Sequence, residues 1–327
     1  NNASGSIPVS AEDIYRIGRK PFDSGQQQYF KGEIDEVRVF NTSLSEDEIQ
    51  KIVYQELDES QNFNRGKIIP KDISANSIGN NLIRYYRMDT FKDDILDNKV
   101  TPSIDVNSGA VIYNIKNLCN QSAPLPYSTI QNGDWNSVDT WTHGDVWDIT
   151  DLNSVKDWSI VEIDNEITLS ASYTSSGLII NENGILNVEE DNVINNTWLL
   201  SLKGILDLKG DSQLLQSIKS DLVTSSNGKI KRRQEGASSA YWYNYWSSPV
   251  GSMSATAYSD NNLETNNSNN SGFKLNMLKK GDGSSFQFTN SYNQTGKISR
   301  YWLYTYINGV TYYDWQSFNE NDTIGVG

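Results

Sequence analysis

The chain has 327 residues and a formal net charge of −14 at pH 7, a field that repels phosphate backbones and anionic lipids and so argues against nucleic acid as a partner. Cys119 is the only cysteine and His143 the only histidine, which excludes an intrachain disulfide and any zinc site built from cysteines or from two histidines. No apolar run reaches the roughly 18 residues of a membrane-spanning helix, so we expect no direct insertion into a membrane.

The balance of residue types favours an all-β fold. Hydrophobic residues make up 36% and charged residues 21% of the chain, and Asn, Ser, Gly and Thr fill much of the rest, as many short strands joined by polar turns require. The length allows two or three domains with cores of their own. We place the boundaries so that four segments result, namely 1–57, 58–128, 129–236 and 237–327.

The first segment carries the most specific pattern. Residues 29–40 read YFKGEIDEVRVF, and residues 41–49 follow as NTSLSEDEI. Together they resemble the closing strands and final turn of a laminin-G-like, concanavalin A-like jellyroll, so residues 1–57 would be the C-terminal part of such a module. A jellyroll needs more strands than residues 1–28 can supply, and we therefore expect the chain to be a piece of a longer protein.

A short helix follows this pattern. Ser45 and Glu48 have the spacing of a capping box, and Ile49, Ile52 and Val53 form an apolar stripe at helical spacing. We predict a helix that ends near Glu56 and lies against the jellyroll.

Residues 58–81 lose periodicity, which is typical of a connector. Residues 82–89, LIRYYRMD, resemble the opening strand of the same jellyroll type, but no second closing pattern follows. We therefore interpret 58–128 as a connector with a strand element.

Four aspartates lie at the end of this strand and in the turn after it. Clustered carboxylates are ligands that calcium prefers, so they form a hypothetical Ca²⁺ site, although their spacing does not match an EF-hand loop. The alternative is a solvated acidic turn. The residues concerned are Asp89, Asp93, Asp94 and Asp97.

A repeat marks the third segment. Residues 184–188, GILNV, recur as residues 204–208, GILDL, with apolar residues on one face and Asn187 or Asp207 on the other. Equal spacing with identical facing favours a short parallel β-solenoid of about four rungs over residues 129–236. A meander of antiparallel hairpins is the alternative, because the intervening residues can also form hairpin loops.

Aromatic residues concentrate in the last segment, 237–327. Residues 241–250 read as a strand, and residues 301–307 and 310–315 flank Asn308-Gly309, which predicts a tight hairpin. We expect a β-sandwich here, incomplete at its C-terminus. Its rings would either fill the core or form a carbohydrate-binding surface, because flat aromatic faces stack on sugar rings. The residues assigned to that surface are Trp242, Tyr243, Trp246 and Trp302.

Further segments extend the resemblance over most of the chain. The jellyroll ending, residues 133–141 (GDWNSVDTW), residues 212–216 (SQLLQ) and residues 245–250 (YWSSPV) look like large secreted surface proteins of gliding Bacteroidetes, the flavobacteria. The resemblance implies export by the type IX secretion system and a location outside the cell, on the outer surface of a Gram-negative bacterium.

The supply of catalytic groups is poor, and we assign no catalytic residue. A Ser-His-Asp triad would have to use His143, and no Gly-x-Ser-x-Gly elbow accompanies any serine. We therefore favour a non-enzymatic adhesin or stalk that serves gliding or attachment and binds glycans or surfaces. The alternatives are a polysaccharide-binding or polysaccharide-degrading protein, and cargo captured on the export translocon.

Overall fold

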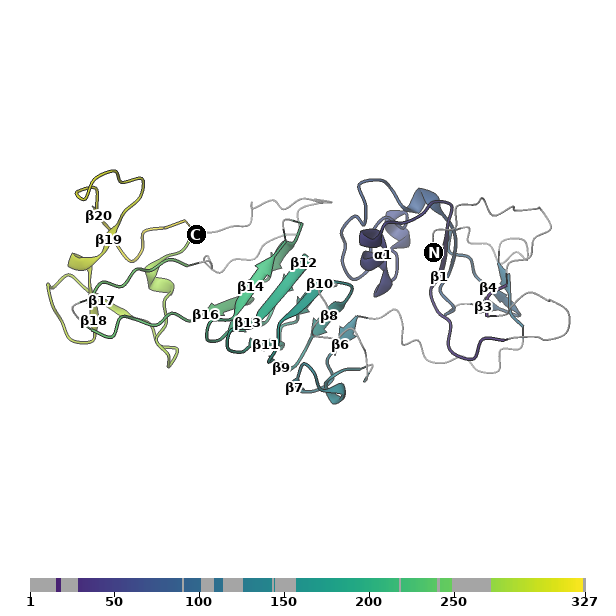
Figure 1. The fold of residues 1–327 in the computed structure, drawn as a ribbon, viewed down its shortest axis with the longest axis horizontal. Helices are drawn as coiled ribbons and strands as arrows, with labels where there is room; N and C mark the ends of the chain where they lie inside the picture. The colour runs from purple at the N-terminus through teal and green to yellow at the C-terminus, as the bar shows by residue number, and fades with distance from the viewer. Residues whose placement is uncertain are drawn as a thin grey trace. The chain divides into compact units, whose positions relative to one another are not determined.

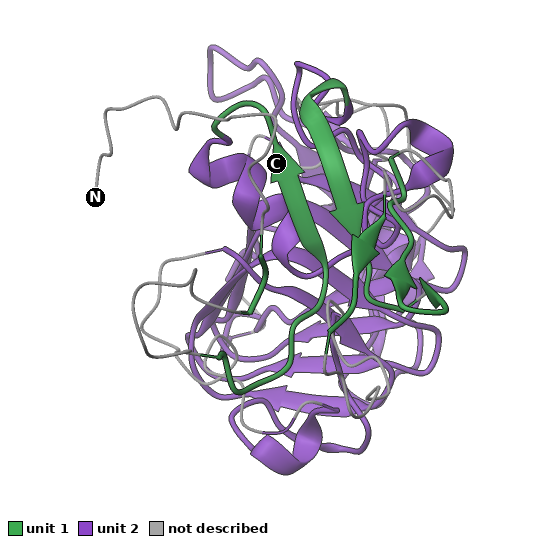
Figure 2. Ribbon diagram, turned by 90° about the vertical axis from the view of Figure 1, so that its right-hand side faces the viewer, with its two compact units in different colours: residues 1–43, 80–123 green, residues 44–79, 124–327 purple. Residues whose placement is uncertain are grey.

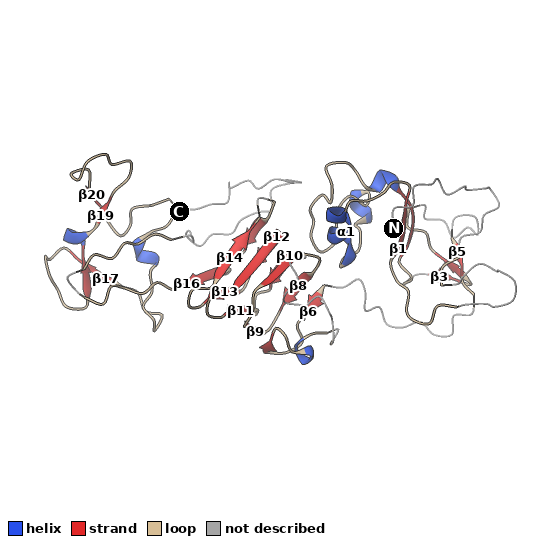
Figure 3. Ribbon diagram, viewed as in Figure 1, coloured by secondary structure: helices blue, strands red, loops and turns tan. Residues whose placement is uncertain are grey.

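The computed structural model describes residues 16–18, 29–89, 91–100, 109–113, 126–142, 144, 157–217, 219–239, 242–248 and 272–325. The chain divides into two compact units, residues 1–43 with 80–123 and residues 44–79 with 124–327 (Figure 2). Most regular structure is β, as Figure 3 shows, which confirms the predicted all-β class. The four predicted domain boundaries are a different division of the chain and stay a prediction.

Two small antiparallel sheets are found among the described residues of the first unit. The strand that resembles the end of a jellyroll pairs with the strand that resembles the start of one, with Val39 opposite Arg84. Residues 82–86 therefore share a sheet with the N-terminal pattern. The pairs are β1 (Val37–Phe40) with β2 (Leu82–Tyr86), and β4 (Ile95–Leu96) with both β3 (Phe91–Lys92) and β5 (Ala110–Val111).

A buried polar group connects β1 and β2. The Tyr85 hydroxyl donates to Glu36 Oε2 at 2.5 Å, and Glu36 also forms an ion pair with Arg38. Burial raises the pKa of the Tyr85 hydroxyl, so it remains a donor. Glu36 and Arg38 of the YFKGEIDEVRVF pattern thus have structural partners within this unit.

The second unit is built on a parallel β-solenoid (Figure 1), in which most consecutive strands alternate between two sheets. Among the described residues, one sheet has six strands and the other five. The first contains β14 (Gln213–Gln216), β12 (Val193–Leu202), β10 (Tyr173–Ile180), β8 (Ile160–Ile163), β6 (Tyr127–Ser128) and β15 (Asp221–Thr224). The second contains β16 (Lys229–Arg232), β13 (Ile205–Leu208), β11 (Ile185–Val188), β9 (Glu166–Leu169) and β7 (Gly133–Asp134).

The predicted sequence repeat corresponds to the register in which the solenoid strands pair. Leu186 pairs with Leu206 and Val188 with Leu208 in parallel strands, which confirms stacked rungs and rejects the hairpin meander. The strands β6 and β7 form a further rung before β8 and β9. Because each of these strands is only two residues long, no periodic pattern in the sequence predicts them.

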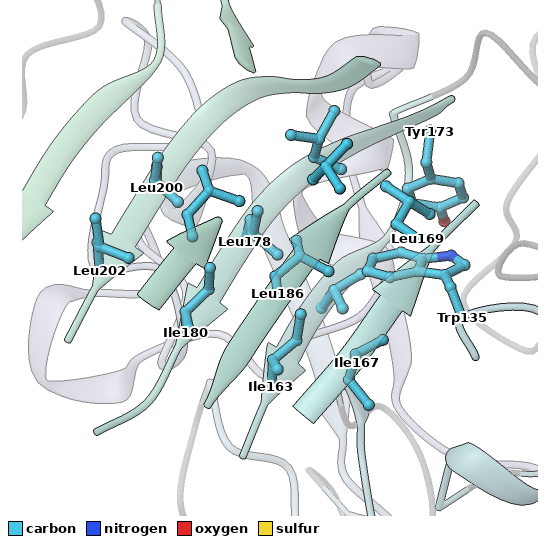
Figure 4. Close-up of a cluster of buried hydrophobic side chains, with 14 of the residues drawn as sticks. Trp135, Ile163, Ile167, Leu169, Tyr173, Leu178, Ile180, Leu186, Leu200 and Leu202 are labelled. Atoms are coloured by element: carbon cyan, nitrogen blue, oxygen red, sulfur yellow. The ribbon is translucent and has the colours of Figure 1, made fainter. Parts of the chain in front are cut away.

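Inward columns of apolar side chains fill the solenoid (Figure 4). Leu178 stacks on Leu200 in one sheet and Leu186 on Leu206 in the other, and all four are fully buried. Outward-facing Asp207 is also buried, because the Arg233 guanidinium pairs with its carboxylate, with Nη2 2.9 Å from Oδ2.

The glycine of each repeat lies where one rung meets the next. A Cβ on Gly184 would lie 2.2 Å from the Ile163 carbonyl oxygen, and one on Gly204 would lie 2.2 Å from the Gly184 oxygen. Gly228 meets the Leu202 oxygen in the same way, at 2.1 Å. Only a residue without a side chain allows the backbones to approach this closely.

The helix α1 (Glu46–Val53) begins at Ser45 with the predicted capping box. The prediction that it lies against the jellyroll stays a prediction; α1 and residues 57–79 belong to the solenoid unit, where Lys51 Nζ lies over the Trp198 ring, 5.4 Å from its centroid. The capping box fixes where a helix starts but not what it packs against.

None of the described helices has both the length and the apolar character that a membrane crossing requires. The part of the chain that the structure describes also has the 3₁₀ helices η1 (Glu59–Gln61), η2 (Gly79–Asn81), η3 (Val138–Thr140), η4 (Leu275–Met277) and η5 (Arg300–Trp302).

A fully buried lysine attaches residues 57–79 to the solenoid. Lys71 Nζ donates to the carbonyl oxygens of Trp198 (2.9 Å) and Lys219 (2.8 Å) and lies 2.7 Å from Asp221 Oδ2. Desolvation lowers the pKa of Lys71. Next to it, Ile69 packs on Gly177, where a Cβ would lie 2.3 Å from Ile69 Cδ1.

The C-terminal segment differs from the predicted sandwich. Among its described residues, two two-stranded sheets replace the packed pair of sheets: β17 (Gln287–Thr289) runs parallel to β18 (Lys297–Ser299), and β19 (Tyr304–Thr305) antiparallel to β20 (Gln316–Ser317). The predicted strand at 241–250 is absent from the described residues 242–248.

The prediction of a tight hairpin at Asn308-Gly309 was also wrong. A type I′ turn needs positive φ at both central residues, and here only Asn308 has it, with φ 54°. The Tyr306 ring lies so close to Gly309 that a Cβ there would meet the ring at 2.4 Å, and strand pairing begins only beyond this loop.

We expect Gly204→Ala to lower the free energy of unfolding by about 1–3 kcal/mol, because the added methyl group meets backbone oxygens of the preceding rung. Chemical denaturation measures the change. Gly281→Ala is the matched control, since nothing lies within 4 Å of a Cβ there. Equal stability of the two variants would contradict the close stacking of rungs.

We expect Lys71→Met to cost about 3–5 kcal/mol, because it leaves the Asp221 carboxylate buried without its cation. Urea unfolding followed by circular dichroism measures this loss. Lys203→Met, at an exposed position of the same solenoid, should change stability by no more than about 0.5 kcal/mol. A loss below about 1 kcal/mol for Lys71→Met would show that residues 57–79 are not attached as described.

Candidate functional site

Three aromatic rings form an exposed cluster in the C-terminal segment. Tyr292, Tyr301 and Trp302 have ring centroids 4.9–5.0 Å apart, with tilted or edge-on geometry. Their exposed fractions are 60%, 55% and 48%. We call this the three-ring cluster, and it includes Trp302, one of the residues assigned from the sequence to a carbohydrate-binding surface.

Arg300 positions the cluster. Its Nε donates to Glu320 Oε2 at 2.6 Å, Nη2 also contacts the Glu320 carboxylate, and Nη1 donates to Asn290 Oδ1 at 2.9 Å. One guanidinium thereby joins the loop before Tyr292 to the turn that carries Tyr301 and Trp302. A bidentate pair of this kind fixes direction as well as distance.

The charges of this pair reinforce each other. The bond from Arg300 lowers the pKa of Glu320, and Glu320 in turn raises the pKa of Arg300. Glu320 is buried, so the pair is partly protected from solvent. Two further hydrogen bonds close the loop: Trp302 Nε1 donates to the Tyr292 carbonyl at 3.2 Å, and Ser299 Oγ donates to the Ser291 carbonyl at 2.7 Å.

A second group of rings surrounds the turn at 308–314. Tyr306 and Trp315 lie 5.0 Å apart, and Tyr312 and Tyr313 are exposed. The Asp314 carboxylate accepts from the backbone of Val310 (2.7 Å) and Thr311 (2.6 Å), which lowers its pKa and holds the turn.

Exposed and fixed rings are suited to binding flat, partly apolar ligands. Each ring of the three-ring cluster leaves part of its surface accessible, and the tyrosine hydroxyls and the Asn290 amide surround it with hydrogen-bonding groups. A concentrated exposed apolar surface is a common mark of an interaction site. The cluster can therefore stack on sugar rings while its polar neighbours bond to their hydroxyls.

The other residues assigned to the surface lie in residues 242–248. Trp242 and Tyr243 are 65% and 76% exposed, whereas Trp246 is half-buried. Among the described residues, no ring contact joins them to the three-ring cluster. The structure thus exposes most of the assigned rings but brings only Trp302 into a cluster.

Sequence reasoning missed Tyr292, Tyr301, Arg300 and Glu320 as members of the site. Tyr292 lies in a loop with no periodic pattern, and Arg300 and Glu320 are 20 residues apart. The adjacent residues Arg300-Tyr301-Trp302 are the one local signal that could have indicated the site.

The four aspartates assigned to a Ca²⁺ site are all described, and two of them pair with cationic side chains. Asp89 pairs with Arg87 at 3.1 Å and Asp97 with Lys99 at 3.0 Å. Across the described ranges, no three acidic, histidine or cysteine side chains gather to hold a metal ion. The Ca²⁺ site stays a prediction without geometric support. His143 and Cys119 lie outside the described residues.

Residues 1–50 match a laminin-G-type family model of the concanavalin A-like lectin/glucanases superfamily. The matched range includes β1 and the first turn of α1. No curated protein and no solved structure matches the chain. The match supports the jellyroll resemblance of the N-terminal segment.

Acid should loosen the three-ring cluster. Glu320 has a lowered pKa in the folded protein. Its contribution to the stability of the cluster is therefore complete above the ordinary carboxyl pKa of about 4.3 and is lost as the pH falls through the lower folded pKa. Near-ultraviolet circular dichroism should therefore show a transition below about pH 4. Glu320→Gln should remove it, whereas Glu235→Gln, at an exposed carboxylate, should keep it. An unchanged transition in Glu320→Gln would contradict the role of the pair.

Proposed function

We propose that this chain is a non-enzymatic segment of a multidomain secreted surface protein that binds carbohydrate through the three-ring cluster. The observation that carries the proposal is the exposure of three mutually packed rings on a frame fixed by Arg300 and Glu320. Rings that fill a core would be buried, as Trp135 and Trp141 are in the solenoid. Exposed rings with fixed orientation are available to a ligand and lose little conformational freedom on binding.

The match of residues 1–50 is a second line of support. Its superfamily is named for lectins and glucanases, so its members include carbohydrate-binding proteins. Superfamily membership of one segment does not give function by itself, which is why the three-ring cluster carries the argument.

The proposed role is that of an adhesin or stalk. The solenoid supplies a continuous core of stacked rungs, a construction suited to holding binding sites on a firm support. Weak sugar contacts at several modules would add through multivalency. The resemblance to surface proteins of gliding Bacteroidetes leads us to propose export by the type IX system and display on the outer cell surface.

We expect the full chain to bind immobilised glycans in a saturable manner on a glycan array. Trp302→Ala or Tyr301→Ala should weaken binding of the best glycan at least about tenfold, the equivalent of roughly 1.4 kcal/mol. Tyr113→Ala is the matched control, because Tyr113 is exposed in the other compact unit. It should leave binding unchanged.

Repeating the array with calcium and with chelator tests the Ca²⁺ prediction in the same experiment. Absence of saturable binding under both conditions, or equal loss in Tyr301→Ala and Tyr113→Ala, would overturn the proposed function.

A further inference from the structure

The last strand of the second solenoid sheet has a free edge. Strand β16 pairs with β13 on one side, and among the described residues no strand pairs with its other side (Figure 1). The Lys229 amide donates to the Gly204 carbonyl oxygen at 2.9 Å, so Lys229 turns its backbone groups toward β13. Successive residues of a strand turn these groups to opposite sides, and those of Ile230 and Arg232 therefore face the free side. This edge can pair with one more strand.

A column of inward apolar side chains ends unfinished at this edge. Leu186 and Leu206 stack in register and are fully buried, whereas Ile230, the next residue of the column, is only half-buried. At the opposite end of the solenoid, next to β7, the buried rings of Trp135 and Trp141 close the core. An apolar side chain from an added strand would extend the column and complete the burial of Ile230.

The outward side of the same edge is basic, although the chain as a whole has a net charge of −14. Arg233 pairs with Asp207 of the preceding rung, so its charge is balanced there. Lys229 and Lys231 are exposed, and within the described part of the chain neither forms an ion pair. Because they are two residues apart on one strand, both side chains point to the same outer face.

These lysines decide which strand the edge accepts. Lysine on an edge strand discourages pairing with apolar strands and with copies of itself. A second copy of β16 would bring lysines close to lysines, and like charges facing each other across a strand pair are destabilising. Carboxylates at those positions would instead be attracted to each lysine. The same two charges that disfavour a second copy therefore select an acidic strand.

We propose that β16 binds an extended acidic segment of a partner protein, which adds a strand to the solenoid sheet. The backbone of that segment bonds to Ile230 and Arg232, and one of its apolar side chains stacks on Ile230. Acidic side chains on either side of that apolar residue lie opposite Lys229 and Lys231. The partner segment must therefore alternate acidic and apolar residues, because side chains alternate between the two faces of a strand.

The test uses a short fluorescent peptide of alternating glutamate and valine, titrated with the full chain and followed by fluorescence anisotropy. We expect saturable binding that weakens as salt is added. A peptide of alternating lysine and valine should not bind. The glutamate peptide with methylated backbone nitrogens should also fail to bind, because it keeps its charge but cannot pair as a strand.

A charge reversal on the protein tests the role of the lysines. Lys231→Glu should weaken binding of the glutamate peptide about tenfold and should allow the lysine peptide to bind. Lys280→Glu, at an exposed position outside the solenoid strands, is the matched control and should leave both results unchanged. Circular dichroism confirms that both variants are folded.

Hydrogen exchange measured by NMR reports strand pairing directly. The Ile230 amide should exchange rapidly in the free chain and become protected when the glutamate peptide binds. The Lys229 amide is the internal control, since its bond to Gly204 protects it in both states.

Three results would overturn the proposal. The first is no saturable binding of the glutamate peptide, and the second is equal binding of its methylated form, which would reduce the interaction to charge alone. The third is self-association of the chain, measured by sedimentation velocity, that the glutamate peptide reverses, because a second copy would then be the occupant of the edge. The site shares no residue with the three-ring cluster, so none of these results bears on carbohydrate binding.

Discussion

The close stacking of one rung on the next is the constraint on which the solenoid unit depends. Gly184, Gly204 and Gly228 bring each corner within van der Waals reach of a carbonyl oxygen of the preceding rung. Because side chains alternate along a strand, this contact also fixes which residues face inward. A slip of one residue would turn the leucine columns to solvent. The glycines thus set the register, and the register assembles the core.

The same register creates an outer face that is too apolar to be left in water. Ile160 and Leu199 point away from the core yet are buried, and Gly177 leaves a depression between them that Ile69 fills. The Lys71 ammonium then fixes how residues 57–79 are oriented on this face, because its one nitrogen must lie within bonding distance of three oxygens. A buried ionic contact of this kind selects one packing arrangement over similar arrangements held by apolar contacts alone, and its net contribution to stability is smaller.

The sequence predicts what is local or periodic and misses what depends on distant contacts. The GILNV and GILDL repeats indicate stacked rungs because identical spacing needs identical surroundings, and Ser45 with Glu48 indicates the helix start. The placement of residues 57–79 depends on Lys71 meeting Trp198, 127 residues away, and an aperiodic segment carries no trace of that contact. The three-ring cluster could not be predicted for the same reason. Its rings are brought together by the Arg300–Glu320 ion pair, whose members are 20 residues apart in the sequence.

Under the proposed function, the three-ring cluster would gain its binding energy from stacking and would tolerate many sugars, since every pyranose has an apolar face. The Arg300–Glu320 pair would contribute by fixing the rings before a ligand arrives, because side chains that are already ordered lose little conformational freedom on binding. Such a surface would favour breadth of capture over discrimination between sugars.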